Sequence, residues 1–453
     1  MNIQNGECLH IVLFGTFNEN KYFLGDYKDK FDLIGFNANI VAYAPAGMAA
    51  FISQLKNKSY FIDPQIYAFQ QPIKTIMRKR EDRSWGLKKS IEKLAKEYGS
   101  IIKEKVGIET IQAQELDNNL IKEVCKNVLK FEYNKIKQAA ENLDVKPFLD
   151  FSGEELRPEF LIAPYFYLDL DNLEKQLEIN MNFLDVSYNL VNDESSDYKG
   201  KLFAEIVIDK DVLVIPQKKD LVVERYKSCN SDGFIIWIDD FLEVDDKLDT
   251  LDKYKAFLKE LATCEKPILQ LHGSYLSVIL AGKELKLLAG VGHGIEYGEY
   301  RPIVPVGGGV PLAKFYFPKF HKRVNYHPDS SNILIEMNWT SSKDEYFKEL
   351  CSCNMCQEII AEDVIDSFQK YGETKLGKNG RRYPTAEAMD MSRRHYLNNK
   401  IDEYIFCREN SIQTIIKQLK QGHSIAEKLK KIHSFDHLNR WIKVLEKMPE
   451  KST

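Results

Sequence analysis

The chain has 453 residues, of which 44% are hydrophobic and 29% charged, and its formal net charge is −4. This length accommodates one large domain with a smaller one, or two to three ordinary domains, each with a full hydrophobic core. The composition excludes a membrane-spanning helix, because no run of eighteen or more apolar residues occurs. The net charge excludes a general attraction to nucleic acid, so such a partner requires local basic patches.

The amino-terminal region predicts a cytoplasmic protein with no membrane partner. It lacks a basic segment before the short apolar stretch at residues 9–17, which has the length of an ordinary strand. Eight cysteines without an export signal are more typical of reduced, buried or metal-bound thiols than of disulfides.

In chain order, the pattern predicts strands at residues 40–44 and 59–63, then a charged helical segment at about 78–150 that reads as an insertion or cap. Short apolar strands then alternate with helical stretches, at residues 160–166, 202–208, 233–239, 267–273 and 285–290. Continuous apolar strands covered on both sides are typical of a parallel sheet. We therefore expect an α/β fold, a TIM-like (β/α)8 barrel over residues 1–345, with a doubly wound sheet as the alternative.

Polar residues follow several of these strands. In a barrel that end is the catalytic face, and paired carboxylates there can divide the roles of nucleophile and general acid or base. The candidates are Asp63, Asp239, Asp240, His272, His293, Glu296 and Glu299. A single Asp after a strand can equally cap the next helix. The glycine runs at 290–294 and 307–309 suit close approach to a phosphate or flat base, or plain tight turns.

Three thiols in Cys351-Ser-Cys353-Asn-Met-Cys356 are followed by His395 in a predicted helix. Three thiolates and one imidazole form a ligand set that Zn²⁺ prefers in closed structural sites. The alternatives are three unrelated buried thiols, or closure by His423, His433 or His437. We expect a zinc-binding helical subdomain over residues 346–453.

Basic patches accumulate toward the carboxyl-terminal half of the chain. They lie at residues 314–323, 375–382, 393–394 and 411–453, the first interleaved with aromatic residues. Solvated helix faces are the simpler explanation of any one charge run. Their mixture with Phe and Tyr beside a metal site favours a surface for a phosphate backbone.

The cysteine motif, its downstream His and the preceding barrel pattern resemble the tRNA-guanine transglycosylase superfamily, which includes relatives that insert 7-deazaguanine bases into DNA. Tyr60-Phe-Ile-Asp63-Pro-Gln-Ile-Tyr-Ala-Phe-Gln70 is similar to the family's Asp-Ser-Gly-Gly-Phe-Gln loop. Residues 237–240, 271–274 and 288–292 resemble the strand that reads the purine, the Gly loop after it and the Met-Gly-Val-Gly strand end.

The resemblance implies a pentosyltransferase that exchanges guanine in DNA or tRNA for a 7-deazaguanine, through a sugar bound covalently to a carboxylate. It implies zinc as cofactor, and a homodimer or a partner subunit. The implied catalytic residues are Asp63, Asp240 and Glu299. The implied substrate-binding residues are Asp239, Gly273, Gly290, Gly292, His293, Lys322 and Arg323. The implied zinc ligands are Cys351, Cys353, Cys356 and His395.

The chain departs from the family where the nucleophilic Asp is expected. The comparable stretch, residues 314–323, contains no Asp, so Asp63, Asp240, Glu296 or Glu299 would have to attack. Two alternatives stay open. One is a catalytically silent nucleic-acid-binding subunit with the same fold, and the other is an unrelated barrel enzyme that binds a small phosphorylated ligand. The separation between Cys356 and His395 is longer than is usual in the family. An insertion that contains the basic, turn-rich segment at 372–384 would explain the extra length, and we expect this segment to contact nucleic acid.

Overall fold

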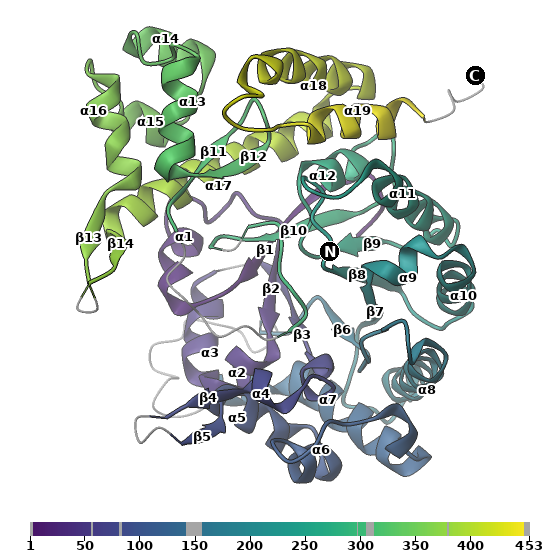
Figure 1. Cartoon of the computed structure of the whole chain (residues 1–453). Helices are drawn as coiled ribbons and strands as arrows, with labels where there is room; N and C mark the ends of the chain where they lie inside the picture. Colours follow the sequence, from purple (N-terminus) through teal and green to yellow (C-terminus); the bar gives the residue numbers. More distant parts are fainter. Residues whose placement is uncertain are drawn as a thin grey trace.

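The centre of the computed structural model is one sheet of eight parallel strands (Figure 1). The structure describes residues 3–55, 58–80, 84–141, 156–296, 298–304, 312–377 and 380–447. In spatial order the strands run β3-β2-β1-β10-β9-β8-β7-β6. Their bounds are β1 (Leu9–Phe14), β2 (Leu33–Asn37), β3 (Ser59–Asp63), β6 (Phe160–Ile162), β7 (Lys201–Asp209), β8 (Gly233–Asp239), β9 (Ile268–Gln270) and β10 (Gly290–Gly294).

The sheet is nearly closed into a barrel. Its two edge strands approach each other where the Glu159 amide, just before β6, donates to the Tyr60 carbonyl of β3 at 2.7 Å. The rings of Phe61 and Phe160 stack across the same seam with centroids 5.2 Å apart. Going round the barrel, the strands follow their order in the chain, so the predicted TIM-like α/β architecture is confirmed.

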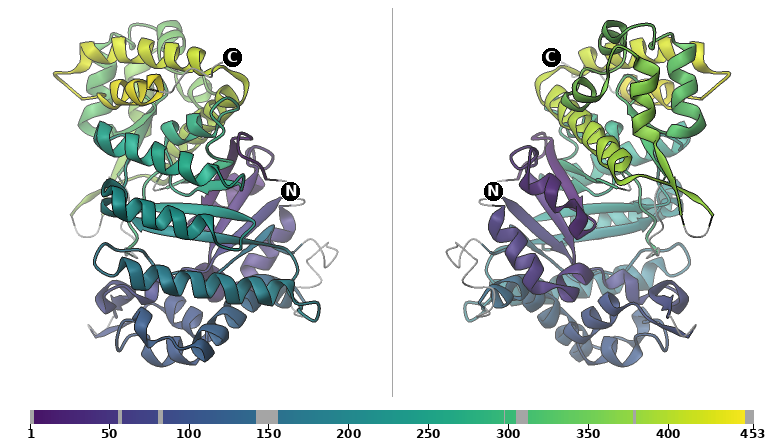
Figure 2. Two further views of the ribbon diagram at one scale, coloured as in Figure 1. Left: turned by 90° about the vertical axis from the view of Figure 1, so that its right-hand side faces the viewer. Right: turned by 90° about the vertical axis from the view of Figure 1, so that its left-hand side faces the viewer.

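Helices cover the outside of the barrel between successive strands (Figure 2). The strands are buried on both faces, as in β8, where all residues from Gly233 to Ile238 are buried, and this is why they read as continuous apolar runs. The covering helices include α2 (Ala38–Tyr43), α3 (Pro45–Gln54), α8 (Leu173–Asn192), α9 (Lys210–Val214), α10 (Pro216–Lys227), α11 (Leu248–Ala262) and α12 (Tyr275–Ala281).

Two predicted strands are misplaced. Residues 40–43, expected in a strand, belong to α2, and the strand β2 precedes them. The last strand starts at Gly290, where the prediction for 285–290 ended. Short apolar runs do not distinguish a strand from a buried helix by periodicity, which explains the first error. The glycines at alternate positions of β10 explain the second error, because Gly has a low β-propensity and weakens the sequence signal of a strand.

Between β3 and β6 the described residues form a small hairpin and four α-helices, at the bottom of Figure 1. After α4 (Ile73–Ile76), the hairpin strands are β4 (Met77–Lys79) and β5 (Trp85–Leu87), followed by α5 (Lys89–Glu97), α6 (Ser100–Lys105) and α7 (Asn118–Ala140). The expected insertion over 78–150 extends past this point, and its residues 142–150 lie outside the described residues.

After the barrel, a hairpin leads into a helical lobe at the top of Figure 1. The hairpin strands are β11 (Lys314–Phe317) and β12 (Lys322–Asn325). The lobe contains α13 (Ser331–Glu336), α14 (Lys343–Glu349), α15 (Asn354–Ile359), α16 (Val364–Gln369), the hairpin β13 (Thr374–Leu376) and β14 (Arg382–Pro384), α17 (Ala386–Glu409), α18 (Ile412–Ala426) and α19 (His437–Glu446). Of all the helices in the described ranges, none combines the length and apolar character needed to cross a bilayer.

Gly35 in β2 is a sensitive point of the barrel wall. A Cβ atom there would lie 2.7 Å from Cζ of Phe61 and 2.8 Å from Cδ2 of Leu13, on the two neighbouring strands. We expect Gly35→Ala to lower the free energy of unfolding by about 1–3 kcal/mol through overpacking, as measured by urea denaturation. Gly47→Ala is the control, because its Cβ would meet only ordinary contacts from 3.5 Å in a helix that favours Ala. Equal stability of the two variants would contradict this account of β2.

Candidate functional site

A cavity of ≈ 590 Å³ opens at the carboxyl ends of the barrel strands. Its wall includes Gly15 and Thr16 after β1, Asn37 at the end of β2, His272 after β9 and Glu296 after β10. The carboxyl ends of the parallel strands all lie at the same end of the barrel, and the functional sites of barrel proteins lie at that end. We call this space the mouth cavity. Its volume falls within the range of about 300–1,000 Å³ that is typical of small-molecule sites.

The lining of the mouth cavity is cationic and aromatic. It contains Lys314, Arg301, Arg323 and Arg393, together with Tyr300, Tyr316 and Tyr396. Among the described residues that line it, Glu296 is the single carboxylate. A negatively charged or π-rich ligand fits such a wall better than a cation does.

Glu296 belongs to a cluster of charges at the edge of the cavity. Its Oε1 accepts a hydrogen bond from Nη2 of Arg393 at 2.8 Å. Glu19 lies behind the wall, where Oε2 accepts from the Gly15 amide at 2.8 Å. Burial raises the pKa of Glu19 to about 7, and the charge of Glu296 adds to this shift. The two carboxyl groups therefore lie at the same end of the barrel, close enough for their charges to interact.

Arg323 is fixed against the wall by three contacts. Its guanidinium donates to the carbonyl oxygens of Ile295 and Glu296, at 2.8 and 3.1 Å. It also lies 3.3 Å from the ring centroid of Tyr396, a close cation–π arrangement. The basic hairpin β11–β12 thus supplies one ordered cation to the cavity.

Several lining side chains carry buried polar atoms that have no hydrogen-bond partner in the described structure. Two of these atoms are Nδ1 of His272 and Oδ1 of Asn39. Burial lowers the pKa of His272 well below its usual value, so its imidazole is neutral at pH 7. Buried polar groups normally have a partner, so a site completed by a hydrogen-bonding ligand accounts for both atoms.

Asp63 lies below the mouth, inside the barrel. Its Oδ1 accepts from the Tyr165 hydroxyl at 2.6 Å and from the Gln65 amide at 2.8 Å. Burial raises its pKa, and those two hydrogen bonds oppose the shift. Glu205 on β7 is also buried, and neither of its carboxyl oxygens has a partner among the described residues. Burial, reinforced by the charge of Asp63, raises the pKa of Glu205 well above its usual value.

The other acidic residues singled out from the sequence lie apart from Glu296. Asp239 accepts hydrogen bonds from the Ile303 amide at 2.7 Å and the Tyr167 hydroxyl at 3.2 Å. Asp240 is exposed, with its side chain 77% accessible, and pairs with Lys210 at 3.2 Å. Glu299 pairs with the buried Lys400 at 3.6 Å. None of the three lines the mouth cavity among the described residues.

The remaining substrate-binding candidates occupy varied places. His293 lies in the barrel with Nε2 2.8 Å from Nε2 of His10, and Lys322 pairs with Asp245 at 3.3 Å. Gly290 opens β10 at its amino end, and a Cβ atom on Gly273 would lie 2.5 Å from Cγ1 of Val291. Gly292 would meet only ordinary contacts. Of these candidates Arg323 lines the cavity, and the roles of the others stay predictions. Residues 307–309 lie outside the described residues.

The four predicted metal ligands come together between α15 and α17. The ligand atoms of Cys351, Cys353, Cys356 and His395 all lie within 4.8 Å of one another. His395 Nδ1 is 3.9, 3.4 and 3.3 Å from the three sulfurs in turn. Metal bonds of about 2.3 Å to sulfur and 2.0 Å to nitrogen in tetrahedral geometry place these atoms about 3.6 Å apart. The spacing therefore fits one metal ion.

The surroundings of His395 prepare it for a metal. Its Nε2 lies 2.7 Å from the Tyr316 carbonyl oxygen, which can only accept, so Nε2 carries the proton and Nδ1 presents its lone pair to the sulfurs. The hydroxyls of Tyr346 and Tyr371 lie 3.3 and 3.4 Å from the Cys356 sulfur. Hydrogen-bond donors around thiolates are typical of metal centres.

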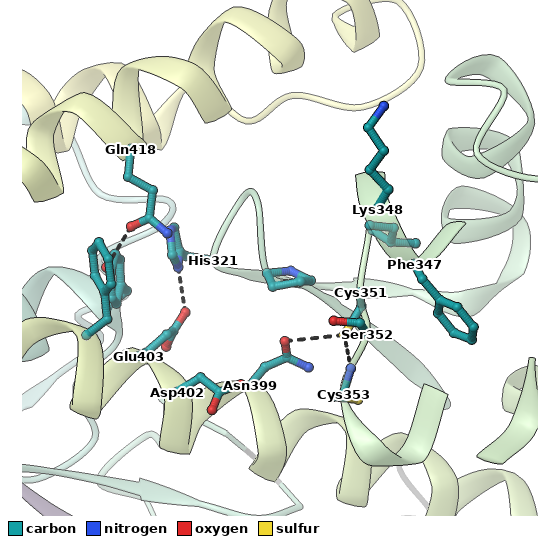
Figure 3. Close-up of a pocket in the computed structure, with 14 residues that line it drawn as sticks. His321, Phe347, Lys348, Cys351, Ser352, Cys353, Asn399, Asp402, Glu403 and Gln418 are labelled. Carbon is teal, nitrogen blue, oxygen red and sulfur yellow. Dashed lines mark hydrogen bonds and ion pairs between the residues drawn. The ribbon is translucent and has the colours of Figure 1, made fainter. Parts of the chain in front are cut away.

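A second cavity, of ≈ 370 Å³, lies beside the cysteine cluster (Figure 3). Cys351, Cys353 and Asn399 line one side, and the hydrogen-bonded pair of His321 and Glu403 lines the other. Glu403 also contacts Lys400, which is fully buried, at 2.7 Å. The buried Lys400 ammonium requires a carboxylate partner such as Glu403, because an isolated buried charge would be strongly unfavourable.

Some residues in the wall of the mouth cavity or directly behind it were not singled out from the sequence. Glu19 carries a recognisable signal, because Thr16-Phe-Asn-Glu19 directly after an apolar strand has the spacing of a capping box, which the structure contains. Tyr396 is adjacent to His395, and Arg393 belongs to a basic pair noted for charge alone. Arg301 and Asn37 carry no local motif, since only barrel closure brings them to the mouth.

The fold and the site define the class: a nearly closed α/β barrel with a cationic mouth cavity and a Cys3His cluster in a helical lobe. Comparison with known proteins adds no closer assignment, because no family model and no curated protein matches the chain.

Removal of one thiol tests the metal site. We expect the purified protein to carry one metal ion per chain by elemental analysis, and Cys356→Ala to carry almost none and to unfold at lower temperature, because metal binding contributes to folding free energy. Cys264→Ala, outside the cluster, is the matched control. Full metal content in Cys356→Ala would contradict the proposed ligand set.

Glu19 provides a pH test. Its carboxyl ionises near pH 4.3 in the unfolded chain and near pH 7 in the folded one, so the folded state loses stability as the pH rises between these values. We expect the Glu19→Gln variant to gain stability relative to wild type from pH 5 to pH 8, by at most about 3 kcal/mol, in urea denaturation series. A stability difference that does not change with pH would show that Glu19 ionises normally.

Proposed function

We propose that this chain is a base-exchanging transglycosylase, which replaces guanine in a nucleic acid with a 7-deazaguanine base. The observation that carries the proposal is the position of Glu296, the single carboxylate among the described residues lining a mouth cavity that is otherwise cationic and aromatic. A carboxylate can attack the sugar, while the cations neutralise phosphates on either side of a flipped nucleotide.

The chemistry requires two displacements at one carbon. A Glu296 oxygen attacks C1′ of the flipped guanosine, the bond from C1′ to N9 breaks, and guanine leaves with that electron pair and takes up a proton. The 7-deazaguanine then gives up its N9 proton and attacks C1′, which releases the Glu296 carboxylate. The ion pair with Arg393 orients the Glu296 carboxylate. His272 and Asn39 offer their unpartnered atoms to the edge of the base.

The carboxylates implied by the family resemblance take other parts in this proposal. Asp63, held by Tyr165 beneath the mouth, is the group to exchange protons with the base. Asp240 and Glu299 are occupied by Lys210 and Lys400, so we assign them to the support of the mouth. Glu296 follows β10, the last barrel strand in the chain, and in this proposal it takes the role of the Asp that is absent at residues 314–323.

The metal we propose for the Cys3His cluster is zinc. Three thiolates and one imidazole satisfy its tetrahedral preference and leave no open position, so the ion would be structural. The proposed division of the chain is the barrel at 1–345, with a helical insertion at about 78–150, and a zinc-binding subdomain at 346–453. In this arrangement the subdomain orients the helix that carries Arg393 and Tyr396.

A base-exchange assay tests the function. Purified protein is incubated with radiolabelled guanine or a labelled 7-deazaguanine and either tRNA or double-stranded DNA. We expect label in one polymer, and a loss of more than about 10³-fold in Glu296→Gln, because the nucleophile is removed. A covalent protein–nucleic acid adduct in denaturing gels should be lost in the same variant.

Asp240→Asn is the matched control for that assay. Asp240 is an exposed carboxylate that follows β8, two strands away from β10 in the sheet, and we expect the variant to retain most activity. Loss of exchange in Asp240→Asn with full activity in Glu296→Gln would overturn the assignment of the nucleophile. Absence of label in both polymers, with salt-dependent binding retained, would favour the catalytically silent binding subunit.

A further inference from the structure

The hairpin β4–β5 is a surface feature that the proposed chemistry does not use. It follows the carboxyl end of β3, so the chain topology places it on the side of the barrel mouth. Lys79 and Trp85 are opposite each other in its antiparallel pairing. Its base is held by the Lys88 amide, which donates to the Ile76 carbonyl, and by Lys88 Nζ, which donates to the Thr75 carbonyl.

Trp85 is unlike the other tryptophans of the chain. Its side chain is 61% exposed, whereas Trp237, Trp339 and Trp441 are at most 3% exposed. The large aromatic ring of an exposed tryptophan is available for stacking against a partner.

The surroundings of Trp85 are strongly cationic. Among residues 74–80 and 84–93, Lys74, Arg78, Lys79, Arg80, Lys89 and Lys93 are exposed. The single acid in these ranges, Glu92, already pairs with Lys96 at 2.9 Å. Over the whole sequence of residues 74–93, eight basic residues stand against three acidic ones, a local excess of five, and such an excess attracts an anionic partner.

The patch adjoins the mouth cavity. Arg301, which lines the cavity, is close enough to Lys88 that its charge reinforces the lowering of the Lys88 pKa by burial. Lys93 of α5 lies over the ring of Tyr43, at the end of α2, whose residues Asn39 and Ile40 line the cavity. In Figure 1 the hairpin projects to the same left-hand side as β13–β14, which exposes Lys375, Leu376 and Arg382.

We infer that the β4–β5 hairpin binds nucleic acid beside the barrel mouth, with the Trp85 ring as the stacking platform for an unpaired base. Arg78 and Lys79 contact the phosphates on either side of that base. The inference deepens the proposed function, on which it rests for the kind of partner. Stacking between a base and an exposed indole, framed by cations, is a sequence-tolerant way to hold the strand from which a nucleotide has been withdrawn.

The test uses the intrinsic fluorescence of the full-length protein. Because the other three tryptophans are buried, a short single-stranded oligonucleotide should quench the solvent-exposed component of the emission, which belongs to Trp85. Trp85→Phe should lose the quenching but bind within a few-fold of wild type, since phenylalanine still stacks. Trp85→Ala should bind about tenfold more weakly, or worse, in an anisotropy titration with a labelled oligonucleotide.

A charge variant completes the experiment. Arg78→Gln with Lys79→Gln should weaken binding and reduce the slope of log affinity against log salt by about one to two, because up to two phosphates are no longer neutralised by the protein. Lys122→Gln with Lys130→Gln, two exposed lysines of α7, is the matched control and should leave both quantities unchanged.

Three results would overturn the inference: wild-type affinity in Trp85→Ala, no quenching by the oligonucleotide, or Trp85 emission that changes with protein concentration alone, which would show a protein contact instead. These outcomes are separate from failure of base exchange. If base exchange fails while the oligonucleotide still quenches Trp85, the transglycosylase proposal is refuted and the stacking platform stands. If base exchange occurs without quenching of Trp85, the stacking platform alone is refuted.

Discussion

The position of helix α17 is the constraint on which the two halves of the molecule depend. His395 points its Nδ1 at the three sulfurs, while its neighbour Tyr396 stacks under Arg323 at the mouth cavity. Two residues earlier, Arg393 holds Glu296. One rigid helix thus fixes the metal cluster and the cavity wall together, so a shift in the lobe would be transmitted to the mouth.

Further along α17, buried charges attach the helix to the barrel. Lys400 and Glu403 form an ion pair away from water, and the Tyr316 hydroxyl and His321 supply further hydrogen bonds to Glu403. Such a pair contributes little net stability because desolvation opposes the Coulomb attraction, but removal of one partner leaves an isolated buried charge. The network therefore favours a single position of α17 relative to the hairpin β11–β12.

The sequence predicts the barrel and the ligand set of the cluster well, because both have short-range signals. Apolar runs mark β7 and β8, and three cysteines within six positions mark the lobe. The mouth cavity is harder to predict, because Asn37, Arg301 and Arg393 meet only through long-range closure of the sheet. Burial, which the sequence does not display, separates the exposed Asp240 from the enclosed Asp63.

The seam of the barrel has a consequence for how the chain folds. Ser59 donates to the Glu159 carboxylate across 100 residues of sequence, and the same stretch makes the backbone bond that joins β3 to β6. Closing so long a loop costs conformational entropy before any contact repays it. We therefore expect this seam to form after β6 has paired with β7, and β7 with β8. Amide hydrogens at the seam should consequently exchange with solvent sooner than those in the centre of β8.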